Sequence, residues 1–181
     1  MGYYTSLIQR KFKDVVGKRY ESVLREYGEF LLSEEEMVVP EIHSILLPLD
    51  IFVKEIPPSL YEVLSAYEGA RVSLVYITDA QVYSVISEVL SAGAGEEFMR
   101  KKEEYGHVLL NQVSGELAAA GIESTQRMFT GHKGEDIEKL ASSHDLVALA
   151  KSYGSEKTEH YPISPLAIRI AQRLKKPTIL F

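Results

Sequence analysis

Five short runs of residues, separated by segments with helical periodicity, constrain the fold more than any other feature of this 181-residue sequence. Four of the runs are apolar and rich in branched residues, as the buried strands of a parallel sheet are. The fifth, at 122–129, alternates apolar and polar residues, which is typical of an edge strand. The four apolar runs are HSILLPL (43–49), VSLVYI (72–77), DLVALA (145–150) and PTILF (177–181).

The segments between these runs carry helix-end signals. Ser59 and Glu62 have the spacing of a capping box, and Ser164 followed by Pro165 is a typical helix start. The sequence SAGAG at 91–95 is expected to interrupt a helix. The expected helices are 59–70, 80–90, 96–120, 134–143 and 164–176.

Strands that alternate with helices predict an α/β fold with right-handed crossovers and an open parallel sheet covered by helices on both faces. Ligands in such sheets bind beyond the carboxyl ends of the strands, where the winding direction reverses. The loops that follow the strands are therefore the places where a functional site is expected.

Composition excludes several function classes. A formal net charge of −6 gives no general attraction to phosphate backbones, so no nucleic-acid partner is expected. The chain has no cysteine, which excludes a thiolate nucleophile and a disulfide framework. No apolar run is long enough to span a bilayer and the first residues lack a signal-peptide pattern, so the expectation is a soluble, cytoplasmic protein.

The order of these segments resembles the universal stress protein family. ILLPLD (45–50) is similar to the family's first strand with its closing aspartate, and ARVSLVYITD (70–79) to the second. Residues 121–150 resemble the third strand, the following turn and helix, and the fourth strand, while 164–181 resembles the closing helix and fifth strand. The resemblance implies a three-layer sandwich with a five-stranded parallel sheet of order 3-2-1-4-5. It covers a UspA-like domain at 43–181, preceded by an N-terminal helical extension at 1–42.

The loop before the last helix departs from the family's pattern. Many nucleotide-binding members carry G-x-x-G, nine residues, then G-[ST]; the matching positions here are Lys151, Gly154, Ser164 and Pro165, of which one is kept. Glycines let backbone N–H groups approach phosphates closely, and proline has no N–H to donate. The resemblance therefore implies a degenerate nucleotide site, with direct contact of Lys151 to the phosphates as the alternative.

Asp50 directly follows the first apolar run. In nucleotide-binding relatives the matching aspartate contacts the adenosine part of the ligand; the alternative is that Asp50 caps a turn and pairs with Lys151. Phe52 adds bulk near the same crevice, and strand-end packing is the alternative role for the expected wall residues at 75–77 and 129–131. If ATP or AMP binding is retained, the expected contact residues are Asp50, Val75, Ile77, Gly131, Lys151, Gly154 and Ser164.

The sequence offers no catalytic or metal-binding constellation. Its five histidines form neither HxH nor HxxxH pairs, and HExxH, Walker and G-x-S-x-G motifs are absent. No set of residues supplies an activated water, a metal clamp or a general base. The expectation is a non-enzymatic stress-response or regulatory protein without a cofactor, and the alternative is a nucleotide-responsive switch that binds ATP or AMP.

Two segments predict contacts with partners. Residues 5–32 form an amphipathic pattern whose apolar stripe needs cover from its own domain, a second subunit or another protein; a membrane surface is disfavoured by the modest net charge. The last strand is expected at a sheet edge, and in the family this strand often pairs with its twin across a dimer axis. The expected homodimer contacts are Pro177, Thr178, Ile179, Leu180 and Phe181.

Overall fold

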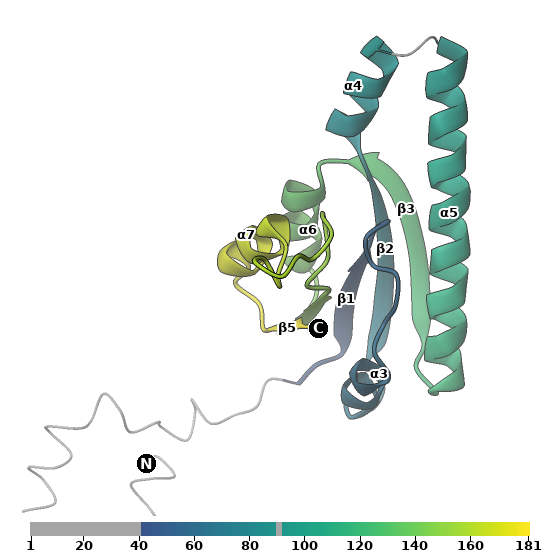
Figure 1. The fold of residues 1–181 in the computed structure, drawn as a ribbon. Coiled ribbons are helices and arrows are strands. Elements are labelled where there is room, and N and C mark those ends of the chain that lie inside the picture. Colours follow the sequence, from purple (N-terminus) through teal and green to yellow (C-terminus); the bar gives the residue numbers. More distant parts are fainter. Residues whose placement is uncertain (1–40, 90–91) are drawn as a thin grey trace, which may run out of the picture. The chain divides into compact units, whose positions relative to one another are not determined.

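A single sheet of five parallel strands, in the order β3-β2-β1-β4-β5, forms the centre of the domain (Figure 1). The computed structural model describes residues 41–89 and 92–181, so the expected amphipathic helix at 5–32 lies outside the described residues. The α/β class and the expected strand order are confirmed. The strands are β1 (Ser44–Leu49), β2 (Arg71–Asp79), β3 (Ser124–Gly131), β4 (Leu146–Leu149) and β5 (Thr178–Leu180).

Burial of the strands follows their place in the sheet. Every residue of β4 is buried, and so is every residue of β1 after Ser44, because these strands are covered on both faces. The strand β3 lies at one edge and has no buried residue, which agrees with its alternating sequence. Three of the four apolar runs therefore correspond to the central strands β1, β2 and β4, whereas the fourth, PTILF, forms the half-buried edge strand β5.

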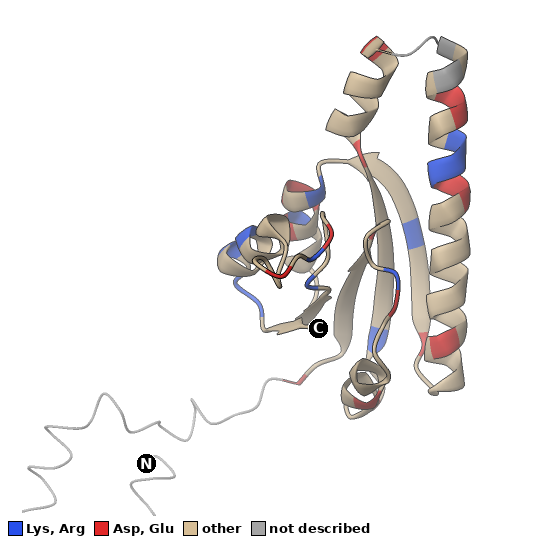
Figure 2. Ribbon diagram, in the orientation of Figure 1, with Lys and Arg blue, Asp and Glu red and all other residues tan. Residues whose placement is uncertain are grey.

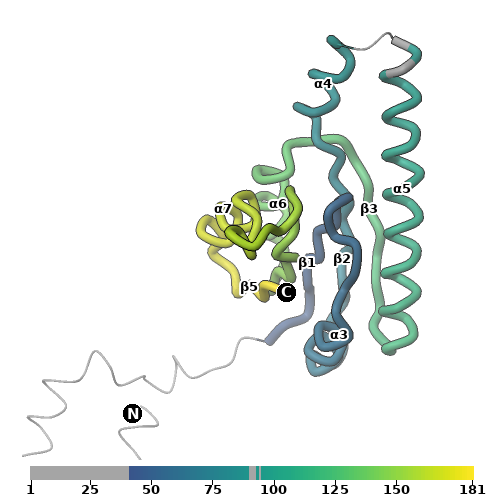
Figure 3. The backbone as a smooth tube through the Cα atoms, viewed as in Figure 1, coloured from purple at the N-terminus to yellow at the C-terminus, as the bar shows by residue number. Residues whose placement is uncertain are grey.

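Helices cover both faces of the sheet. The long helix α5 packs against β2 and β3, whereas α6 and α7 lie on the other face (Figures 1 and 3). This division follows from right-handed crossovers, because the chain winds toward β3 first and toward β5 afterwards. The helices are α3 (Pro58–Ser65), α4 (Ala80–Val89), α5 (Ala92–Ala119), α6 (Lys133–Ala141) and α7 (Pro165–Arg173).

Two helix starts differ from the sequence-based expectation. The N-cap of α3 is Pro57 and no side chain caps the helix, so the predicted capping box of Ser59 and Glu62 is wrong. Pro58 occupies the first helical position, where its fixed φ and missing N–H favour an earlier start. Helix α5 begins at Ala92 instead of Glu96, so most of the SAGAG sequence is helical.

Helices α4 and α5 form a hairpin that extends past the carboxyl ends of the strands (Figure 1). Its two arms approach closely, since a Cβ on Gly95 would lie 3.8 Å from the Ser87 Cα atom. No residue of α4 is buried. Figure 2 shows that α4 carries little charge, whereas the adjoining part of α5 carries both signs. Among the helices at 41–89 and 92–181, none combines the length and apolar character that a bilayer span requires.

Candidate functional site

The winding direction of the sheet reverses between β1 and β4, and Asp50 directly follows β1 at this point. Such a switch point is where α/β sheets usually bind ligands. The Asp50 side chain is completely buried, with an exposed fraction of 0%. A carboxylate that is fully removed from water needs hydrogen-bond donors or a cation to compensate for its lost hydration.

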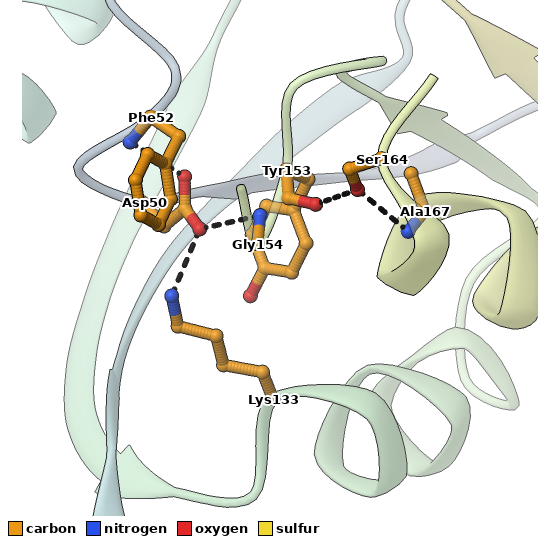
Figure 4. Close-up of polar contacts among 7 residues, drawn as sticks. All are labelled: Asp50, Phe52, Lys133, Tyr153, Gly154, Ser164 and Ala167. Carbon is orange, nitrogen blue, oxygen red and sulfur yellow. Dashed lines mark hydrogen bonds and ion pairs between the residues drawn. The ribbon is translucent and has the colours of Figure 1, made fainter. Parts of the chain in front are cut away.

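Three groups from separate parts of the chain satisfy the Asp50 carboxylate (Figure 4). Its Oδ1 accepts a hydrogen bond from the Phe52 backbone N–H at 2.9 Å. Its Oδ2 accepts one from the Lys133 ammonium at 2.8 Å and one from the Gly154 backbone N–H at 2.7 Å. The carboxylate thus holds together the β1–α3 turn, the start of α6 and the β4–α7 loop.

Lys133 is the cation of this site, and its side chain is only 10% exposed. Its Nζ lies 5.7 Å from the centroid of the Phe52 ring and 5.5 Å from that of Tyr153, distances typical of cation–π contacts. The predicted pairing of Asp50 with Lys151 is therefore wrong, because Lys133 fills that role. Lys133 reaches the switch point because α6 begins there, directly after β3.

Lys151 instead connects segments through its backbone. Its N–H donates to the Phe181 carbonyl oxygen at 2.7 Å, and its carbonyl oxygen accepts from the Ser164 N–H at 2.7 Å. These bonds fix the end of β4, the end of β5 and the start of α7 to one another. The N–H of Lys151, which in a phosphate-binding loop would be free to bind an anion, is used inside the protein.

The Ser164 hydroxyl is also fully engaged. Its Oγ accepts a hydrogen bond from the Ala167 N–H at 3.0 Å, which confirms the predicted N-cap of α7. The same hydroxyl donates to the Tyr153 carbonyl oxygen, and the Ser164 side chain is completely buried (Figure 4). The residue at the second half of the expected phosphate motif therefore stabilises the loop and the helix end.

Gly154 is the one position where the expected motif is kept, and the fold itself requires glycine there. Its φ of +90° lies in a region that L residues rarely adopt. A Cβ at this position would lie 2.6 Å from Leu166 Cδ2, so the loop also packs directly on α7. Both constraints exist without any phosphate.

Tyr153 contributes a buried ring beside the ion pair. Burial is the main cause that raises the pKa of its phenol well above the ordinary value, and the negative charge of Asp50 adds to the effect. The phenol therefore stays neutral, and its ring lies 5.5 Å from the Lys133 ammonium. Neither Tyr153 nor Lys133 belongs to a motif, so neither could be singled out from the sequence.

A cavity of about 320 Å³ opens beside this network, between the end of β2 and the α4–α5 hairpin. Of the expected contact residues, Ile77 and Gly154 line it. Val75 lies within β2, buried and paired with Pro48 of β1, and Gly131 ends β3 against the Asp136 carboxylate. The structure thus brings Asp50, Gly154 and Ser164 together, and it places Val75, Gly131 and Lys151 elsewhere than on the wall of this cavity.

Within the described part of the chain, no group of three or more His, Asp or Glu residues is placed to hold a metal ion. At the switch point the Asp50 carboxylate and the Ser164 hydroxyl are hydrogen-bonded, whereas the buried Tyr153 hydroxyl has no hydrogen-bond partner among the described residues. The cavity beside them is lined mainly by apolar and aromatic side chains.

Comparisons with known proteins agree with this fold. No protein-family model matches the sequence, and the search of curated proteins finds no match. Universal stress protein UspA from Lactobacillus plantarum matches with a TM-score of 0.63 at 13% identity, over 79% of this chain and 99% of that one. A family protein from Burkholderia pseudomallei gives a TM-score of 0.55 at 16% identity, over 79% and 98% of the two chains.

A third solved structure, a universal stress protein family protein from Arabidopsis thaliana with AMP bound, matches with a TM-score of 0.50 at 11% identity. The match covers 76% of this chain and 90% of that one. At these identities the likeness concerns the fold, and it extends over nearly the whole of each solved structure. The strand order, the crossovers and these matches show that the chain has the fold of the universal stress proteins.

Proposed function

We propose that this chain is a non-enzymatic stress-response or regulatory protein of the universal stress protein type, whose nucleotide site is closed by its own side chains. The observation that carries the proposal is the Asp50 carboxylate, buried and bonded to Lys133 and Gly154. A nucleotide that used this carboxylate would first have to displace those donors. Hydrogen bonds to charged groups contribute about 1.5–3 kcal/mol each, so two of them weaken binding by roughly two to four orders of magnitude.

Isothermal titration with ATP and AMP, with and without magnesium, tests the closed site. The wild type is expected to show no binding at nucleotide concentrations up to about 1 mM. A Kd of about 1 mM corresponds to a binding free energy of only about 4 kcal/mol, and displacing the donors from Asp50 costs a comparable amount. Lys133→Ala is expected to bind AMP measurably, since it removes the cation that covers Asp50 and leaves space between Phe52 and Tyr153. Lys151→Ala is the matched control and is expected to stay silent, because Lys151 contributes through its backbone.

The alternative function is a nucleotide-responsive switch that binds ATP or AMP. It is supported by the cavity beside Asp50, which Ile77 and Gly154 line, and by the bound AMP in the Arabidopsis thaliana protein of the same fold. In this alternative, binding would release Lys133 from Asp50. Micromolar binding of AMP to the wild type would establish this alternative and exclude the closed site.

The proposal includes a homodimer through β5. This strand lies at a sheet edge and its residues are half-buried. The backbone groups of Pro177 and Phe181 bond to β4, so in a parallel ladder those of the alternate residues, Thr178 and Leu180, point to the open edge. Contact with a partner protein through residues 5–32 remains a prediction, since that segment lies outside the described residues.

Sedimentation equilibrium tests the dimer. The wild type is expected to be dimeric at tens of micromolar, and Thr178→Pro is expected to shift the mass to that of a monomer, because proline removes an N–H from the open edge. Thr178→Val retains that N–H and serves as the control. A monomeric wild type, or a dimer that survives the proline, would contradict pairing through this strand.

A further inference from the structure

We propose that the cavity between β2 and the α4–α5 hairpin binds a small aromatic carboxylate, held by apolar side chains and by the ammonium group of Lys102. The inference rests on the proposed function, in which the nucleotide site is closed by the protein's own side chains. It names the class of ligand that fits the cavity beside that closed site. It assigns a binding role to the α4–α5 hairpin.

The walls of the cavity suit a planar apolar ligand. Its volume is about 320 Å³, at the lower end of the range of roughly 300–1,000 Å³ that small-molecule sites occupy. Four aromatic rings and a methionine side chain contribute to the lining, and such rings stack on planar ligands. These residues are Phe52, Tyr76, Tyr83, Phe98 and Met99.

Lys102 supplies a positive charge on the cavity wall, which also carries the carboxylate of Asp79. Its Nζ lies 5.1 Å from the centroid of the Phe98 ring, and in residues 41–89 and 92–181 it has no ion-pair partner. Its neighbours differ, because Arg100 is paired with Glu104 at 2.7 Å and Lys101 with Glu97 at 2.8 Å. Lys133, the other cation on the cavity wall, is committed to Asp50. An anionic group on the ligand would therefore pair with Lys102.

Helix α4 gives a further reason to expect a ligand. Val82 and Tyr83 line the cavity, yet they are 49% and 39% exposed, and α4 has no buried residue. An apolar ligand would cover these two side chains and part of α5 at once. Burial of apolar surface favours binding, so the hairpin would be stabilised together with the ligand.

The position of Lys102 distinguishes this ligand from a nucleotide. Lys102 lies on α5, which covers one face of the sheet, whereas the loop that resembles a phosphate motif leads into α7 on the other face. Gly154 and Ser164 in that loop are bonded within the protein. A carboxylate attached directly to an aromatic ring would reach Lys102 without a sugar or a phosphate.

Titration of the full chain with 2-naphthoate, followed by ligand fluorescence and calorimetry, tests the proposal. Saturable binding with a Kd below about 1 mM is expected. Lys102→Gln is expected to weaken binding about 10–100-fold, because a charge-assisted hydrogen bond is lost. Lys101→Gln is the matched control and is expected to change Kd less than about 2-fold, since Lys101 is exposed and does not line the cavity. Equal effects of the two substitutions would overturn the role of Lys102.

A second pair of variants tests the cavity without changing a cation. Val82→Asp places a carboxylate on the cavity wall and is expected to reduce naphthoate affinity at least about 10-fold. Val85→Asp introduces the same charge on the same helix, at a side chain that is 60% exposed and does not line the cavity, and is expected to bind as the wild type does. Loss of binding in both variants, or in neither, would overturn the location of the site.

The two proposals fail in different ways in these titrations. If the wild type binds AMP at micromolar levels, the closed nucleotide site is wrong whatever naphthoate does. If the wild type binds neither AMP nor naphthoate, the closed site stands and the aromatic-carboxylate site is overturned. Binding of naphthoate that AMP fails to displace at about 1 mM supports both.

Discussion

Asp50→Asn is expected to lower the free energy of unfolding by about 3–5 kcal/mol, because it leaves the Lys133 ammonium buried without its counter-charge. Asparagine also replaces one of the two acceptor oxygens with an NH₂ donor. This donor would face either the Lys133 ammonium and the Gly154 N–H, or the Phe52 N–H. Urea unfolding followed by circular dichroism measures the change. A loss below about 1 kcal/mol would show that the ion pair contributes little to the fold.

A double-mutant cycle separates the pair from its surroundings. Lys133→Met keeps an unbranched side chain between Phe52 and Tyr153, and it leaves the Asp50 carboxylate with two backbone N–H donors. Its cost is therefore expected to be smaller than that of Asp50→Asn. The double variant is expected to be more stable than Asp50→Asn alone, since it removes the unpaired ammonium. Additive effects would mean that Asp50 and Lys133 do not interact.

The ion pair between Lys54 and Glu156 provides a matched control at the surface. Its N–O distance is 3.2 Å, but the two side chains are 72% and 68% exposed. Glu156→Gln is expected to change the free energy of unfolding by less than about 1 kcal/mol, because exposed pairs gain little from their attraction in water. The contrast between the two pairs would show that burial, and not the pairing alone, makes Asp50 important for stability.

The sheet could be predicted because burial on both faces leaves a direct record in the sequence. The central strands β1 and β4 are apolar almost throughout, and the edge strand β3 alternates, so run length and alternation indicated both identity and position. The start of α7 was equally clear, since Ser164 and Pro165 act locally. The start of α3 was not, because Pro57 and Pro58 override the capping spacing of the residues that follow.

The contacts of the candidate site could not be predicted in the same way. Asp50 and Lys133 are 83 residues apart, and nothing local to TGHKGED indicates where the lysine points. Lys151 was the expected partner because of its place in a motif, whereas Lys133 pairs with Asp50 because α6 begins beside the end of β1. The Lys102 cavity could not be predicted for a related reason: its walls come from β2, α4, α5, the start of α6 and the loops after β1 and β4, which lie far apart in the sequence.

Gly154→Ala is expected to lower the free energy of unfolding by about 2–5 kcal/mol. A non-glycine residue in the left-handed region costs about 1–2 kcal/mol, and forcing extra volume into a packed contact costs about 1–3 kcal/mol more. Both apply here, because φ is +90° and a Cβ would lie 2.6 Å from Leu166 Cδ2 and 2.8 Å from Leu166 Cβ. Any shift that relieves the contact would also weaken the 2.7 Å bond from the Gly154 N–H to Asp50.

Gly69→Ala is the control for backbone strain alone. Its φ is +75° and no atom lies within 4 Å of the added Cβ, so a loss of only about 1–2 kcal/mol is expected in the same urea experiment. Equal losses at the two positions would mean that the loop moves away from Leu166 at little cost. A larger loss at Gly154 would explain why this position keeps the glycine of the phosphate motif, whereas Lys151, Ser164 and Pro165 depart from the motif. The contact with α7 and the hydrogen bond to Asp50 would require a glycine at position 154 even where no phosphate binds.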